Sequence, residues 1–249
     1  MATRLHVGAK HLKGDLEAYA KRFDLLEVAV PEAADLRFAP TPATLRRWRK
    51  AAPPTFEFCV IAGPNVARLR PGDALEAELE VTLAQLTTLE SRAVLLRTPI
   101  DVTPGPVWRD RMQRMLDRLP RDVTSVIWEP RGVWQAEEAA EQAKRWGVVL
   151  AVDPLREEVP DGPVAYVRLR ELGATRSYGL SQLDRVAQAI GQDRRDAYVV
   201  IETSGALKEC KTLRRLVRES KGGARAGAAR LIRPRGIKVL RIPEGEQDE

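Results

Sequence analysis

The sequence predicts a (β/α)₈ TIM barrel with a basic C-terminal extension. Eight short apolar runs recur along the 249 residues, and segments with helical periodicity separate most of them. The runs are rich in Val, Ile and Leu and alternate little, which is typical of parallel strands buried on both faces. A chain of this length commonly forms one such domain. An eight-stranded doubly wound sheet is the competing interpretation, but no Gly-rich phosphate loop follows the first run.

The eight predicted strands are short and bounded by turn residues. They cover residues 5–7, 25–30, 56–61, 93–96, 123–128, 148–152, 164–169 and 197–201. The predicted helices lie between them or follow the last one, at residues 12–20, 44–50, 73–89, 107–119, 136–146, 180–190 and 206–217. Pro42 opens the second helix, since proline is tolerated in a first helical turn. Asp73 is expected to cap the third.

Two segments depart from the regular alternation. The link after the sixth strand is short and rich in Pro and acidic residues, so the crossover helix there is expected to be short or missing. After Ser220 the Lys-Gly-Gly-Ala-Arg-Ala-Gly run reads as a flexible linker, followed by a segment that could form a hairpin and by an acidic tail. We therefore predict a barrel domain over residues 1–220 and an extension over residues 221–249.

Composition excludes several classes of protein. Two cysteines are too few for a disulfide scaffold or a Cys-rich metal site. No apolar run approaches the roughly 20 residues that span a bilayer, and the first residues lack the apolar core of a signal peptide. These features predict a cytoplasmic protein without a membrane partner, and they leave its oligomeric state open.

The net charge of +6 comes from the C-terminal region. Residues 208–241 contain 12 of the 41 Lys and Arg residues and only two acidic residues, whereas residues 1–207 have equal numbers of acids and bases. Such a block can neutralise phosphates, which predicts salt-sensitive binding to nucleic acid without sequence readout. A solvated helix with a solubilising tail is the alternative. Aromatic residues are absent from 208–249, which disfavours base stacking.

Charged residues follow or end several of the predicted strands. In a TIM barrel the C-terminal ends of the strands converge on one face, where chemistry is expected. The residues concerned are Lys10, Glu27, Arg97, Glu129, Arg131, Asp153, Arg168, Arg170 and Glu202. Guanidinium groups in such a place suggest an anionic ligand, because their fork matches phosphate or carboxylate. A structural ring of ion pairs closing the barrel is the alternative.

Two functions follow from these patterns. The first is a hydrolase or lyase acting on an anionic small molecule or nucleic acid. In it Glu129 or Glu27 is the general acid or base, Arg131 and Arg168 hold the anion with Lys10 and Arg97, and Asp153 and Glu202 hold a divalent metal ion. The second is a non-catalytic barrel whose basic C-terminal region docks on nucleic acid or an acidic partner.

The order of several motifs resembles the YecE-like family, also called domain of unknown function 72. The motifs are Val-Gly-Ala-Lys at 7–10, Tyr-Ala-Lys-Arg-Phe at 19–23, Thr44 to Trp48 with Phe-Glu-Phe at 56–58, Trp-Glu-Pro-Arg-Gly-Val-Trp at 128–134 and Tyr-Val-Arg-Leu-Arg at 166–170. The resemblance implies a TIM barrel and carries no settled activity.

The sequence also departs from the family pattern. Several positions at which the family usually has a particular polar residue carry a different residue here: Ala29, Ile61, Gly132, Arg170 and Glu202-Thr203. The residues that are retained are Glu27, Glu129, Arg131, Asp153 and Arg168. The resemblance therefore implies a divergent member.

Overall fold

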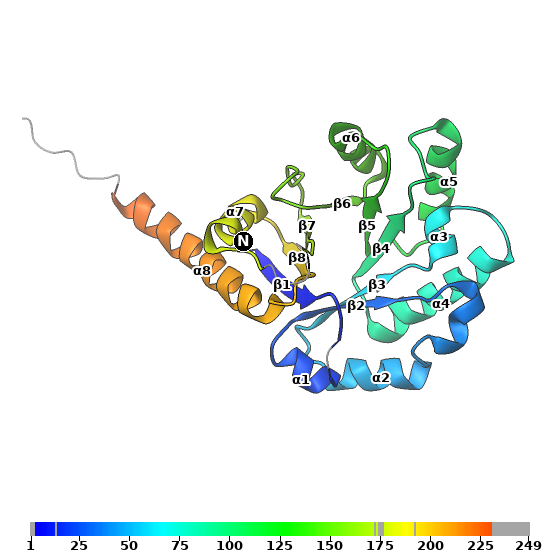
Figure 1. Ribbon diagram of the computed structural model, residues 1–249, viewed down its shortest axis with the longest axis horizontal. Helices are drawn as coiled ribbons and strands as arrows, with labels where there is room; N and C mark the ends of the chain where they lie inside the picture. The colour runs from blue at the N-terminus through cyan, green and yellow to red at the C-terminus, as the bar shows by residue number, and fades with distance from the viewer. Residues whose placement is uncertain (1–2, 13, 172, 174–176, 192, 231–249) are drawn as a thin grey trace, which may run out of the picture.

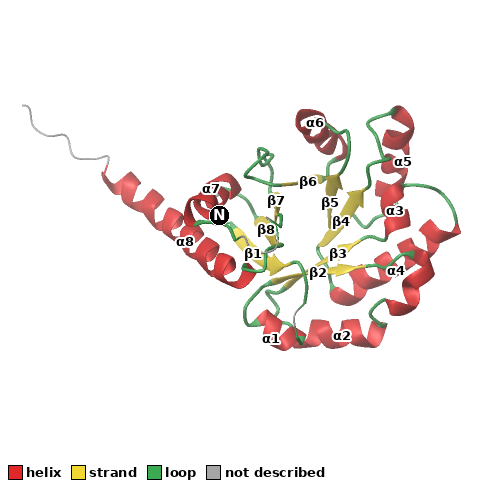
Figure 2. Cartoon of the chain, in the orientation of Figure 1, coloured by secondary structure: helices red, strands yellow, loops and turns green. Residues whose placement is uncertain are grey.

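Eight parallel strands form a nearly closed barrel with helices on its outer side (Figures 1 and 2). The computed structural model describes residues 3–12, 14–171, 173, 177–191 and 193–230. The strands are β1 (Arg4–Ala9), β2 (Leu25–Ala29), β3 (Glu57–Ile61), β4 (Ala93–Thr98), β5 (Ser125–Pro130), β6 (Val149–Val152), β7 (Val164–Leu169) and β8 (Asp196–Ile201). Their hydrogen-bonded order is β1-β8-β7-β6-β5-β4-β3-β2. The first and last strands of the chain are therefore neighbours, as the predicted TIM barrel requires.

The helices alternate with the strands, as the periodicity predicts. They are α1 (Leu16–Ala20), the 3₁₀ helix η1 (Ala33–Phe38), α2 (Pro42–Ala51), α3 (Pro64–Arg68), α4 (Asp73–Leu89), α5 (Pro106–Leu116), α6 (Ala136–Trp146), α7 (Leu180–Ile190) and α8 (Ala206–Arg230). No helix lies between β6 and β7 in the part of the chain that the structure describes, which confirms the expected missing crossover (Figure 1). No helix in the described residues is both long and apolar enough to cross a membrane.

Two layers of apolar side chains surround the barrel wall. The inner layer fills the cylinder with residues such as Leu95, Ile127 and Tyr166. The outer layer lies between strands and helices and includes Val94, Trp128 and Val167. Inner and outer residues alternate along each strand, because successive side chains point to opposite faces. Both faces of the sheet are apolar, so the strands read as continuous hydrophobic runs.

The seam between β1 and β2 is closed by a side chain. Here the Tyr19 hydroxyl accepts a hydrogen bond from the Ala9 N–H at 2.9 Å and donates to the Leu25 carbonyl at 2.9 Å. Gly8 lies so close to β2 that an added Cβ would stand 2.4 Å from the Leu25 carbonyl oxygen. A hydroxyl and a glycine thus bring the two strands together.

Two short helices, η1 and α3, were not predicted from the sequence. A buried carboxylate on α4 explains both. Glu78 accepts hydrogen bonds from the backbone N–H of Ala33 at 2.8 Å and of Val66 at 3.2 Å. It thereby satisfies donors that the first turn of a helix leaves unpaired. The local sequence of these two helices does not reveal them, because the carboxylate that caps them lies elsewhere in the chain.

Other boundaries differ from the sequence prediction. The fifth strand was expected at residues 123–128 but begins at Ser125, because the Thr124 N–H bonds to the Pro120 carbonyl in a turn and Val123 is exposed. Asp73 was expected to cap α4, but it is the first helical residue, and Gly72 is the cap without a side-chain bond.

The last helix is longer than predicted. It continues to Arg230 through the segment interpreted as a linker, and Figure 1 shows it projecting away from the barrel. Alanine and arginine dominate residues 224–230, and both favour helix over coil. The hairpin and acidic tail, predicted within residues 231–249, lie outside the described residues. The division at residue 220 stays a prediction.

We expect Tyr19→Phe to lower the free energy of unfolding by about 1–3 kcal/mol, since it leaves buried backbone groups of β1 and β2 without a partner. Tyr198→Phe is the matched control, because the Tyr198 hydroxyl makes no hydrogen bond with the described residues. Urea unfolding of both variants measures the difference. Equal losses would mean that the seam does not depend on this hydroxyl.

Candidate functional site at the barrel mouth

The candidate site is a layer of charged side chains inside the C-terminal end of the barrel. A residue two positions beyond an inward-pointing residue of a strand also points inward. The inner apolar layer contains Leu25, Leu95, Ile127, Tyr166 and Val200. Two positions further along stand, in the same order, Glu27, Arg97, Glu129, Arg168 and Glu202. Alternation along the strands therefore brings five charged side chains from distant parts of the sequence to one rim.

Arg168 lies at the centre of this layer and contacts three carboxylates. Its Nη1 and Nη2 both donate to Glu27, with 3.1 Å between Nη2 and Oε2. Nη2 also donates to Oε1 of Glu202 at 2.8 Å, and Nε lies 3.6 Å from Oε2 of Glu129. Removing one partner of such a buried pair typically costs about 3–5 kcal/mol. The cluster therefore ties β2, β5, β7 and the residue after β8 together.

Glu129 is held by three guanidinium groups. Arg97 Nε donates to its Oε2 at 2.8 Å, and Arg170 Nη2 donates to its Oε1 at 3.0 Å. Nε of Arg168 lies 3.6 Å from the same Oε2. Burial alone would raise the pKa of Glu129, but the charges of Arg168, Arg97, Arg170 and Arg131 outweigh burial and lower it. A general acid at neutral pH needs the opposite shift. Glu129 is therefore better suited to holding arginine side chains in place than to donating a proton.

Tyr166 belongs to the inner apolar layer but bonds to the charged layer, and it was not identified as a site residue from the sequence. Its hydroxyl donates to Oε1 of Glu27 at 2.5 Å and lies 3.6 Å from Sγ of Cys59. Burial raises the pKa of Tyr166 well above its usual value, so the hydroxyl keeps its proton and serves as a donor. The signal was present in the sequence, because Tyr166 stands two residues before Arg168 in a strand of period two.

The remaining predicted residues lie around this layer. Lys10 pairs with Glu171 at 3.5 Å between Nζ and Oε2. Arg131 is exposed and makes no hydrogen bond with the described residues, although its charge acts on Glu129. The structure therefore brings Glu27, Arg97, Glu129, Arg168 and Glu202 into one network, with Lys10 and Arg131 outside it. The catalytic and ligand-binding roles assigned to them stay predictions.

The predicted metal ligands, Asp153 and Glu202, do not fit a metal ion. Asp153 accepts the Leu155 N–H at 3.1 Å and lies 3.6 Å from Nε of Arg156. Glu202 bonds to Arg168, whose positive charge opposes a cation at this carboxylate. Among the described residues no group of three or more His, Cys, Asp or Glu side chains is placed to hold a metal. We therefore assign no step to a metal at this site.

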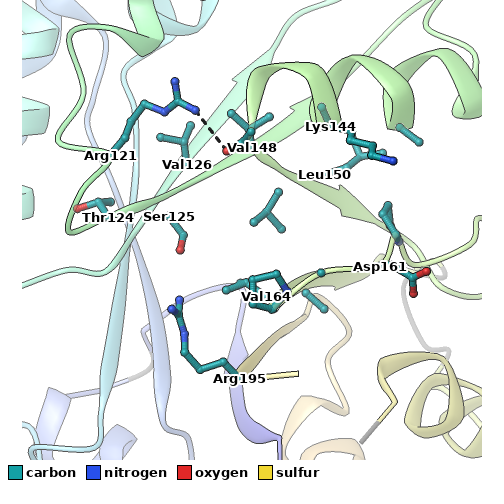
Figure 3. Close-up of a pocket in the computed structure, with 18 of the residues that line it drawn as sticks. Arg121, Thr124, Ser125, Val126, Lys144, Val148, Leu150, Asp161, Val164 and Arg195 are labelled. Carbon is teal, nitrogen blue, oxygen red and sulfur yellow. Dashed lines mark hydrogen bonds between the residues drawn. The ribbon is translucent and has the colours of Figure 1, made fainter. Parts of the chain in front are cut away.

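A cavity of about 1080 Å³ lies at the opposite end of the barrel, near the starts of β5, β6 and β7 (Figure 3). It occupies the region where no helix follows β6. Val126, Leu150 and Val164 contribute apolar walls, and Arg121 donates to the Gly147 carbonyl at 3.4 Å. Acidic residues also line the cavity, and their negative charges balance the positive charges of Lys144 and Arg195. The strand-end residues of the charged layer do not line it.

Comparison with known proteins decides the family. The sequence profile of "Protein of unknown function DUF72" matches residues 6–231, nearly the whole chain. The chain belongs to the DUF72 family. This confirms the resemblance that the motifs indicate. A search of curated proteins found none similar to this DUF72 protein.

Solved structures agree with the fold. A DUF72 family protein from Enterococcus faecalis V583 superposes with a TM-score of 0.68 at 16% identity, covering 88% of this chain and 98% of that one. For a DUF72 family protein from Thermotoga maritima MSB8 the TM-score is 0.57 at 15% identity, with coverage of 86% and 99%. A Brucella melitensis protein described as AP endonuclease, family 2, gives 0.55 at 14% identity, with coverage of 81% and 93%. At these identities the likeness establishes the fold alone.

We expect Glu129→Gln to lower the free energy of unfolding at pH 7 by about 3 kcal/mol, because three guanidinium groups lose their shared counter-charge. The pKa of Glu129 is lowered in the folded protein, so its stabilisation is present above the unfolded pKa of about 4.3 and is lost as the pH falls through the lowered value. The difference between wild type and variant should therefore narrow below about pH 4.3.

Urea unfolding between pH 7 and pH 3 measures this difference. Glu141→Gln is the control, since that carboxylate forms an exposed ion pair with Arg145 at 3.5 Å and should change stability little at any pH. A Glu129→Gln loss that is constant with pH would show that packing, and not charge, is responsible.

Proposed function

We propose that the barrel mouth binds an anionic, phosphate-bearing ligand through Arg97, Arg170 and Arg131. The observation that carries this proposal is a difference in exposure between acids and bases. The side chains of Glu27 and Glu129 are 4% and 2% exposed, whereas those of Arg97 and Arg170 are 27% and 43% exposed. Arg97 and Arg170 are therefore closer to solvent than these two carboxylates, so a ligand approaching the mouth meets their positive charges before it meets Glu27 or Glu129.

The arginines have donors left for such a ligand. Arg97 bonds to Glu129 through Nε, and Arg170 bonds to it through Nη2, which leaves other N–H groups of both side chains without a partner among the described residues. Glu129 fixes the two guanidinium groups from below, which reduces the entropy lost when they bind an anion. Planar forks held in this way match the geometry of phosphate oxygens. Arg131 adds a further exposed positive charge nearby.

Pyrophosphate is a suitable probe of this site. We expect Arg97→Ala and Arg170→Ala each to weaken pyrophosphate binding by about 10- to 100-fold, the equivalent of losing one charge-assisted hydrogen bond. Isothermal titration calorimetry at low salt measures the affinity. Arg46→Ala removes one exposed positive charge from α2 and should leave the affinity unchanged. Equal affinity in all four proteins would disprove binding at the mouth.

Hydrolysis of the bound phosphate ester is a second candidate, and the position of Glu202 favours it. Glu202 bonds to Arg168 through Oε1 only, and its side chain is 17% exposed. Its Oε2 could accept a proton from a water molecule as the water oxygen attacks phosphorus and the ester P–O bond breaks. Glu27 suits this role less, because Arg168 and Tyr166 occupy its oxygens. The AP endonuclease fold relative is named for nucleic-acid cleavage, which is the same class of anionic substrate.

We expect Glu202→Gln to slow the hydrolysis of p-nitrophenyl phosphate or its bis-ester by about 100-fold or more, as general-base catalysis implies. Pyrophosphate affinity should change little, because the arginines remain. Glu171→Gln, which changes an exposed carboxylate next to Lys10, is the control. Release of p-nitrophenolate is the readout. Wild-type protein that binds pyrophosphate and releases no product would reject hydrolysis of these esters and retain the binding function.

A further inference from the structure

A second basic surface lies on the outer side of the barrel, away from the mouth. A groove of about 450 Å³ separates the end of α1 and the turn before β2 from α8. The polar residues along it are Lys21, Arg22 and Asp24 on one side and Arg214 and Arg218 on the other. It lies at the junction between the electrically balanced body of the barrel and the basic C-terminal region.

The groove contains four cationic side chains and one acidic side chain. Asp24 pairs with Arg214 at 2.9 Å between Oδ2 and Nη2, and Arg214 also donates to the Arg22 carbonyl at 3.0 Å. These contacts fix Arg214 in the wall of the groove. Lys21, Arg22 and Arg218 are exposed, and the Glu17 carboxylate lies 3.4 Å from Nζ of Lys21. The groove therefore keeps an excess of positive charge that faces solvent.

The same positive charge continues along α8. Lys211, Arg214 and Arg218 follow one another at steps of three and four residues, so they share one face of the helix. At 1.5 Å per residue, the row from residue 211 to residue 218 runs for about 10 Å. Figure 1 shows α8 projecting past the barrel.

A straight row of cations is suited to a ligand with repeating negative charges. We propose that the groove and this face of α8, together called the α8 surface, bind the phosphodiester backbone of a nucleic acid without reading its sequence. Neutralising several phosphates releases counterions and gives salt-dependent affinity. Residues 208–249 contain no aromatic side chain, so the contact is to the backbone and not to stacked bases.

A membrane surface matches the α8 surface less well. Helices that lie on anionic bilayers insert large apolar side chains opposite their basic face. After Val217, residues 218–230 contain no apolar residue larger than alanine. The apolar residues earlier in the helix, such as Leu213 and Val217, are buried against the barrel. The α8 surface therefore has positive charge but no large apolar side chain that could insert into a bilayer.

The test is fluorescence anisotropy of a fluorescein-labelled 20-base-pair DNA duplex titrated with the full-length chain at several salt concentrations. We expect the logarithm of the binding constant to fall linearly with the logarithm of the salt concentration. The variant Lys21→Ala/Arg22→Ala/Lys211→Ala/Arg218→Ala should bind at least 10-fold more weakly at low salt. Its salt slope should be shallower by about 3 to 4, since each lost phosphate contact removes about one unit.

A control with the same net charge distinguishes a local surface from overall charge. Arg46→Ala/Arg47→Ala/Lys50→Ala/Arg114→Ala removes four exposed cations from α2 and α5 and should leave affinity and slope near the wild-type values. Circular dichroism and thermal unfolding check that both variants fold. Equal losses in both variants, absence of duplex binding by the wild type, or binding only to phosphatidylserine vesicles would each overturn the proposal.

Discussion

The buried contact between Arg168 and its three carboxylates is the interaction on which the charged end of the barrel depends. A guanidinium group and several carboxylates taken out of water lose far more hydration energy than an apolar layer would. Hydrogen-bond partners offset this loss: Glu27 and Glu202 contact Arg168, and Arg97 and Arg170 contact Glu129. The carboxylates oppose the effect of burial, which lowers the pKa of Arg168, and raise it above its ordinary value.

In the proposed function, this arrangement assigns structural support and ligand contact to different residues. Buried acids hold the more exposed arginines in fixed positions, and the arginines present their remaining donors to the mouth. Tyr166 extends the support downward into the apolar interior, because its hydroxyl bonds to Glu27 while its ring packs in the inner layer near Tyr198. The structural ring of ion pairs and the proposed ligand site, which the sequence leaves as alternatives, can thus be two levels of one cluster.

Much of this arrangement follows from the order of residues along the chain. The apolar runs predict the strands, and their spacing predicts the barrel. The period of two along a strand then predicts that Glu27 and Arg168 face the same interior. Partner choice does not follow, because it depends on distances across the ring between residues up to 141 positions apart. Asp153 shows the limit: it follows a strand as predicted, yet it accepts a hydrogen bond from Leu155 in its own loop.

The C-terminal region shows a different limit. Glycines at 222, 223 and 227 favour a linker by local propensity, whereas the helix that starts at Ala206 continues through them. The sequence shows only that this region has an excess of basic residues, whereas the helix places some of them on one face. Three of them, Lys211, Arg214 and Arg218, share a face that begins in a groove with Lys21 and Arg22 from the other end of the chain.

The strands of the barrel are not equally paired, because β6 is short. It pairs through only two residues with β5 and two with β7, whereas β4 and β5 pair through six. The following link has no helix, and its residues 156–158 are exposed. Arg168 and the acids it contacts are supplied by β2, β5, β7 and the end of β8, so none of them comes from this link. A circularly permuted chain that starts and ends there would keep the charged cluster within continuous segments, with few backbone bonds interrupted.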